Sequence, residues 1–88
     1  MRAQFDAIRE QIALNDEAIV AAVNHRLELV AELWQLKGQL GLDTVDPDRE
    51  RRLRERLAAA SVGPLTPEGL DRLVTDLLDL TKRELGAA

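Results

Sequence analysis

The sequence contains no cysteine and a single histidine, His25. The missing cysteines exclude disulfide bonds, thiolate metal sites and thiol nucleophiles, and one histidine leaves no histidine cluster for a metal. Aromatic side chains are confined to Phe5 and Trp34. Any chemistry of this chain therefore has to use carboxylates, cations, hydroxyls and backbone groups, and we expect neither a metal nor a cofactor.

Long apolar runs are also missing. Met1 leads straight into an amphipathic pattern without an apolar leader segment, and nowhere do about 18 apolar residues follow one another. The formal net charge of −4 disfavours binding to nucleic acid and to anionic lipid. These features predict a cytoplasmic protein that contacts neither membranes nor nucleic acids.

What the sequence does have is helix-forming residues in a short chain. Its 88 residues are 45% hydrophobic and 32% charged, and Leu, Ala, Glu and Arg are abundant. This composition is typical of a folded helical protein. The length predicts one domain, residues 1–88, and a domain this small buries proportionally little surface. A partner chain would help to stabilise it.

The first predicted helix is long, and it runs from about Arg2 to Leu40. Apolar residues recur along it at intervals of three and four, which excludes a strand. Gly41 is placed to end this helix, because glycine readily adopts the left-handed conformation that follows a last helical turn.

Two further helices are indicated after the breakers "GLDTVDP" and "SVGPLTPEG". Asp46 is a suitable N-cap with Pro47 at the first helical position, and that helix reaches about Ala60. The same arrangement recurs at Thr66 and Pro67, which begin a helix that fades near residue 86. We therefore expect an all-α fold with a long, a short and a medium helix.

Three cations lie on the apolar seam of the long helix: Arg9, Arg26 and Lys37. Arg26 and Lys37 are eleven residues apart, so they share a face with their Cα atoms about 16 Å apart. Arg9 is 28 residues from Lys37, or about 42 Å along a straight helix. Arg9 could join the other two only if a second copy of the helix ran antiparallel to the first, which predicts an interlocked dimer.

Cations in a helical seam have a structural explanation as well as a functional one. They commonly extend to solvent, pair with an acid such as Asp16, or fix the register of packed helices. Three inward cations on one helix are harder to explain in this way, because an unpaired buried cation is costly. The combination favours an anionic ligand.

Four stretches carry a resemblance that spans nearly the whole chain: "IREQIALND", "HRLELVAELWQLK", "DRER" just after Asp46, and "LLDLTKREL" at the end of the last helix. With these stretches the sequence resembles the all-helical, intertwined-dimer class of chorismate mutase. The resemblance implies a homodimer of three-helix chains with two identical sites. It also implies the cofactor-free rearrangement of the dianion chorismate to prephenate, a step of Phe and Tyr biosynthesis.

The resemblance also implies roles for the cations. Arg9 falls on an arginine that is donated across the dimer interface to a substrate carboxylate. Arg26 and Arg49 fall on carboxylate-binding arginines of the same chain, and Lys37 falls on the lysine that faces the breaking ether bond. Their neighbours in "DRER" and just after it are expected to be solvated and to have no role: Asp48, Arg51 and Arg52.

On the same resemblance, Asp46 matches an aspartate whose backbone meets the C4 hydroxyl of the substrate, and Glu50 matches the glutamate that accepts from this hydroxyl. Thr81 matches a small hydroxyl residue of the last helix. Four residues later the family usually has a glutamine that contacts the ether oxygen, whereas this sequence has Leu85, which cannot donate a hydrogen bond. Either Glu84 serves there when protonated or one contact is missing. The implied catalytic groups are Lys37, Glu50 and Arg26.

Other functions stay open on these residues. An isochorismate pyruvate lyase or an aminodeoxychorismate mutase of the same fold would use the same cations, although an acceptor at Glu50 favours a 4-hydroxyl or 4-amino substrate. A non-enzymatic helical adaptor could pair its seam charges across its own dimer. The ending "ELGAA" resembles short actinobacterial members of the family, some of which rely on a partner enzyme of the shikimate pathway.

Overall fold

The structure is a computed structural model that describes residues 1–86. It contains three helices, α1 (Arg2–Leu40), α2 (Pro47–Ala60) and α3 (Pro67–Leu85). No strand occurs within residues 1–86. The all-α prediction and the long, short and medium lengths are confirmed.

The helix ends follow from local sequence. Gly41 ends α1 in the left-handed conformation, with φ 71°. At the start of α2 the carboxylate of Asp46 accepts from the backbone N–H groups of Asp48 and Arg49, at 3.1 and 3.2 Å. Pro47 follows the cap at the first helical position, where its missing N–H costs nothing. Local capping therefore fixes where the chain leaves α1 and enters α2.

The third helix begins in the same way as the second. The hydroxyl of Thr66 accepts from the backbone N–H of Gly69 at 3.0 Å, and Pro67 is the first helical residue. Gly86 ends α3 with φ 75°. The two caps and the two terminal glycines confirm the predicted helix boundaries.

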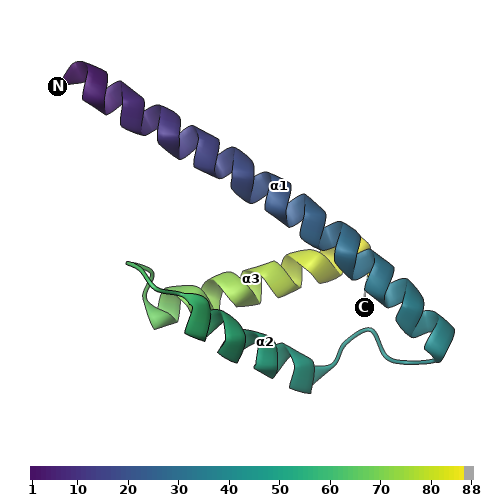
Figure 1. Cartoon of the computed structure of the whole chain (residues 1–88). Helices are drawn as coiled ribbons and strands as arrows, with labels where there is room; N and C mark the ends of the chain where they lie inside the picture. The colour runs from purple at the N-terminus through teal and green to yellow at the C-terminus, as the bar shows by residue number, and fades with distance from the viewer. Residues whose placement is uncertain (87–88) are drawn as a thin grey trace.

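The three helices form an open arrangement (Figure 1). α2 and α3 lie side by side, and the second half of α1 packs on α3. On α2, the guanidinium of Arg54 donates to the carboxylate of Asp71 at 2.6 Å and to the hydroxyl of Thr75 at 2.9 Å, both on α3. The N-terminal half of α1 extends away from both other helices (Figure 1), and residues 1–20 are all exposed.

Very little of the chain is buried within a single copy. Among residues 1–86, only Val74 and Thr81 are buried. The radius of gyration is 16.6 Å, against about 12 Å for a compact domain of this length. The accessible surface is 7232 Å², about 2,000 Å² more than a folded monomer of this mass usually exposes.

The excess surface includes apolar side chains of the N-terminal half of α1. Phe5, Ile8, Ile12 and Ile19 are 46%, 50%, 55% and 53% exposed. The predicted apolar seam is therefore packed only where α1 passes over α3, from about Val23 onward.

None of the helices described has an apolar stretch that could cross a bilayer.

Candidate active site

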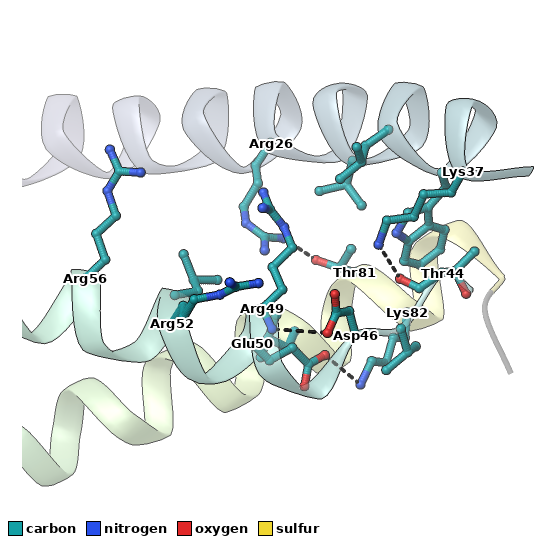
Figure 2. A pocket seen from close by; sticks show the side chains of 16 residues that line it. Arg26, Lys37, Thr44, Asp46, Arg49, Glu50, Arg52, Arg56, Thr81 and Lys82 are labelled. Carbon is teal, nitrogen blue, oxygen red and sulfur yellow. Dashed lines mark hydrogen bonds and ion pairs between the residues drawn. The ribbon is translucent and has the colours of Figure 1, made fainter. Parts of the chain in front are cut away.

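A cavity of about 440 Å³ lies between the second half of α1, the start of α2 and the end of α3. Figure 2 shows its charged side chains converging from all three helices. Its apolar lining includes Val30, Leu33 and Trp34 of α1. The charged residues that line it are Arg26, Lys37, Asp46, Arg49, Glu50, Arg52, Arg56 and Lys82.

The long helix contributes Arg26 and Lys37, three turns apart. Both are half-buried, as their seam positions predicted. The ammonium of Lys37 donates to the backbone carbonyl of Thr44 at 3.3 Å, in the loop that leads to α2. This contact holds the loop close to α1 at one end of the cavity (Figure 2).

At the other end of this face, Arg26 points from α1 toward α3 (Figure 2). Its guanidinium donates to the hydroxyl of Thr81 at 2.6 Å. That hydroxyl in turn donates to the backbone carbonyl of Leu77 at 2.7 Å. Thr81 is 4% exposed, so its single proton is already used inside α3 and its oxygen accepts from Arg26.

Burial has an electrostatic effect on Arg26. Partial removal from water lowers the pKa of its guanidinium below the ordinary value, because desolvation disfavours the charged form. An arginine begins so high that it stays protonated throughout the physiological range. The cavity therefore presents a fixed, partly desolvated cation on the α1 side.

The start of α2 contributes Asp46, Arg49 and Glu50 to the cavity. Asp46 uses its side chain to cap the helix, as described above. Arg49 is exposed and lines the cavity, and Glu50 is half-buried. The carboxylate of Glu50 lies 3.4 Å from the ammonium of Lys82 on α3. A negative group in the first turn is also favoured by the partial positive charge of a helix N-terminus.

The sequence-predicted residues fall into two groups. Six of them line this one cavity: Arg26, Lys37, Asp46, Arg49, Glu50 and Thr81. Arg9 and Leu85 are not among the lining residues. Arg9 lies on the extended half of α1, with its guanidinium 5.2 Å from the ring centre of Phe5. Leu85 is half-buried and Glu84 is exposed, so a substrate contact at either position stays a prediction.

Three cations of the cavity had no predicted role: Arg52, Arg56 and Lys82. Arg52 was expected to be a solvated neighbour; it is exposed, yet it lines the cavity. Arg56 rises from α2 toward α1 (Figure 2). Lys82 follows Leu78 by one helical turn, so it lies on the inner face of α3. The sequence signal for Lys82 is its place four residues after Leu78, on the apolar stripe of α3.

The charges of the cavity are strongly unbalanced. Six cations and two carboxylates line it, which gives a formal charge of +4. Among residues 1–86, Lys82 is the only one of these cations with a carboxylate within 4.0 Å. Unpaired cations in a partly desolvated cavity favour an anionic ligand, and the volume suits a small molecule.

Comparisons with known proteins identify the family of this chain. A family model described as chorismate mutase type II matches residues 8–84. The chain is also 35% identical over 85 residues to the T-protein of Enterobacter agglomerans, covering 96% of this chain but 22% of that protein. It therefore spans about a fifth of the length of this curated relative. No solved structure matches the chain. Because the family match extends over most of the sequence and all three helices, the chain belongs to the type II chorismate mutase family.

Proposed function

We propose that this domain is an isomerase that rearranges chorismate to prephenate. The observation that carries the proposal is the set of five cations in one cavity without a carboxylate partner among the described residues. Chorismate is a small dianion, and its rearrangement is unimolecular. Such a step needs a group that binds and polarises the substrate, but it needs no nucleophile.

Binding is the first part of the proposed mechanism. Arg26 and Arg49 grip the two carboxylates, because the planar guanidinium matches a carboxylate with two parallel hydrogen bonds. This grip holds the enolpyruvyl side chain folded over the ring. Fixing a reactive conformation in this way removes much of the entropic barrier to an intramolecular step.

Polarisation is the second part. Negative charge grows on the ether oxygen of chorismate as its bond to the ring carbon lengthens. Lys37 is assigned to this oxygen, because it is half-buried and held in place by its contact with the carbonyl of Thr44. A preorganised donor of this kind stabilises the transition state more than the ground state, typically by a factor of about 10²–10³ in rate.

A second copy of the chain completes each site in this proposal. Arg9 is 17 residues from Arg26 on the same helix, which is about 26 Å, so the Arg9 of one copy cannot serve that copy's own cavity. The exposed apolar side chains lie on the same half of α1 as Arg9. An antiparallel partner would cover them and bring its own Arg9 toward the cavity.

The surface area supports the same dimer. Each copy exposes about 2,000 Å² more than a compact monomer of this mass. Covering that area on two copies would bury roughly 4,000 Å², which lies in the range of obligate homodimers. The intertwined homodimer and a cytoplasmic location are parts of this proposal, and so is an activating enzyme of the shikimate pathway, which would raise a turnover that the chain already has alone.

The experiment that tests the reaction is a side-by-side assay of chorismate, isochorismate and aminodeoxychorismate. Glu50 is the acceptor for the C4 substituent in this proposal, so isochorismate should be the poorest substrate. A chorismate mutase should have its highest kcat/KM for chorismate. If pyruvate were released faster from isochorismate, the domain would be an isochorismate pyruvate lyase. If the amino substrate were preferred, it would be an aminodeoxychorismate mutase.

Binding of a bicyclic dicarboxylate that mimics the transition state separates an enzyme from an adaptor. We expect it to raise the Tm of the wild-type chain and to have a much smaller effect on Lys37→Ala. A Tm that does not change in either protein would support an adaptor whose seam charges pair across the dimer.

A further inference from the structure

An ion pair joins α2 to α3 at the side of the cavity away from α1 (Figure 2). The ammonium of Lys82 lies 3.4 Å from Oε1 of Glu50. The two side chains are 32% and 30% exposed, so both are largely withdrawn from water. Among the described residues, this is the one ion pair whose two members both line the cavity.

The position of Lys82 follows from α3. It lies one turn after Leu78 and directly after Thr81, on the face that packs toward the other helices. It also lies in the last turn of α3, where a cation is favoured by the partial negative charge of the helix end. The backbone of α3 therefore aims this ammonium at the first turn of α2.

We propose that Lys82 is a positioning residue that holds the carboxylate of Glu50 aimed into the cavity, and so makes the site selective for a substrate with a hydrogen-bond donor at C4. This inference rests on the proposed function. It adds a residue to which the family resemblance gave no role, and it assigns that residue to substrate selection rather than to the bond rearrangement.

The chemistry of a carboxylate supports this role. An ionised carboxylate only accepts hydrogen bonds, whereas a protonated one also donates. The ammonium of Lys82 holds the carboxylate of Glu50 from α3 at 3.4 Å, at the edge of the cavity that both residues line. In this position Glu50 can accept a hydrogen bond from a hydroxyl group of the ligand.

The geometry leaves room for the substrate at the same carboxylate. The 3.4 Å separation is longer than a charge-assisted hydrogen bond of about 2.7–2.9 Å, so the pair is an ionic contact rather than a tight bond. A carboxylate has about four acceptor positions on two oxygens. One contact with Lys82 therefore leaves Glu50 able to accept from a ligand hydroxyl.

The test uses the full chain and four variants. Lys82→Met keeps an unbranched side chain, one atom shorter, and removes the charge. Lys82→Arg keeps the charge, and Glu50→Gln removes the carboxylate. The fourth combines Lys82→Met with Glu50→Gln. Arg83→Met is the matched control, because Arg83 is the exposed neighbour and does not line the cavity.

Two probes separate selection from a structural role: chorismate and its analogue without the 4-hydroxyl. For Lys82→Met we expect kcat/KM for chorismate to fall about tenfold or more, the typical effect of losing a hydrogen bond to a charged group. For the analogue we expect a change within about twofold. Lys82→Arg should restore the preference, and Arg83→Met should leave both values unchanged.

The double variant gives the coupling between the two side chains. If Lys82 acts through Glu50, adding Lys82→Met to Glu50→Gln should change kcat/KM for chorismate only slightly. Equal losses on both probes would overturn the inference, because a substrate carboxylate contact or a packing role would affect the two alike. Full additivity in the double variant would also overturn it.

Calorimetric binding of the bicyclic dicarboxylate, with and without its hydroxyl, provides a readout that does not require turnover. Lys82→Met should weaken binding of the hydroxyl form alone. If the wild-type chain neither converts chorismate nor binds these compounds, the proposed function fails and this inference fails with it. If the wild type is active but the preference is unchanged in Lys82→Met, only the role of Lys82 fails.

Discussion

The guanidinium of Arg26 donates to the hydroxyl of Thr81 across 2.6 Å, and this bond joins α1 to α3 through residues 55 positions apart. The hydroxyl proton is donated to the carbonyl of Leu77, one turn earlier in α3. Thr81 therefore orients Arg26 and has no proton left for a ligand in this arrangement. Its proposed contribution to the site is the direction in which Arg26 points.

Replacement of Thr81 tests this orienting role. Thr81→Val keeps the shape and removes the acceptor, so we expect KM for chorismate to rise about tenfold, as for the loss of a hydrogen bond to a charged group. The value of kcat should change less, because Arg26 binds a carboxylate in the ground state and the transition state alike. Thr81→Ser keeps the hydroxyl and is the control. A loss confined to kcat would show instead that Thr81 contacts the reacting atoms.

Burial of Arg26 adds a desolvation penalty to folding that does not depend on pH in the working range. Its lowered pKa means that the unfolded chain holds the proton more tightly. Both states stay protonated below the folded pKa, and this penalty is therefore constant from about pH 5 to pH 9. The bond to Thr81 acts in the opposite direction, because its loss leaves a buried hydroxyl oxygen without this donor. We expect Arg26→Met to lower kcat/KM by about 10²-fold or more, and its Tm to differ from that of the wild type by the same amount at every pH in this range. A Tm difference that changes between pH 5 and pH 9, measured by circular dichroism, would contradict this expectation.

The shared site predicts complementation between inactive variants. Arg9→Ala and Lys37→Ala should each be inactive as homodimers. On random mixing, half of the dimers are mixed and each of these has one intact site, so about a quarter of wild-type activity should return. Subunit exchange is confirmed separately with tagged chains. Activity that does not return after exchange would mean that both groups act from one chain.

The apolar seam of the N-terminal half of α1 should hold the dimer together. Ile12 is 55% exposed in a single copy, and Ile12→Lys would bury a charge at the proposed interface. We expect this variant to sediment as a monomer at micromolar concentration and to lose activity. Glu17→Lys places a lysine at a polar position of the same helix and should remain dimeric. Wild-type protein that sediments as a monomer would remove the shared site.

The helix boundaries could be predicted because their causes are local. Asp46 with Pro47 and Thr66 with Pro67 set two helix starts through contacts within three residues, and Gly41 ends α1 by its left-handed backbone. None of these depends on the rest of the chain.

The candidate site could be predicted only in part, because its pairs are distant in sequence. The position of Arg26 on the seam was visible, whereas its contact with Thr81 depends on how α1 packs on α3. The pairing of Glu50 with Lys82 likewise depends on how α2 packs beside α3. Periodicity places a side chain on a face but does not say which side chain of another helix it meets.

Steady-state turnover of chorismate, by the purified wild-type chain and by Lys37→Ala, is the sharpest test of the proposed mutase reaction. Gln35→Ala, an exposed position on the same helix that does not line the cavity, is the control. We expect wild type and Gln35→Ala to form prephenate far faster than the uncatalysed reaction in buffer, and Lys37→Ala to lower kcat about 10²–10³-fold. Prephenate formation by the wild type no faster than in buffer, or a rate unaffected by Lys37→Ala, would contradict this expectation.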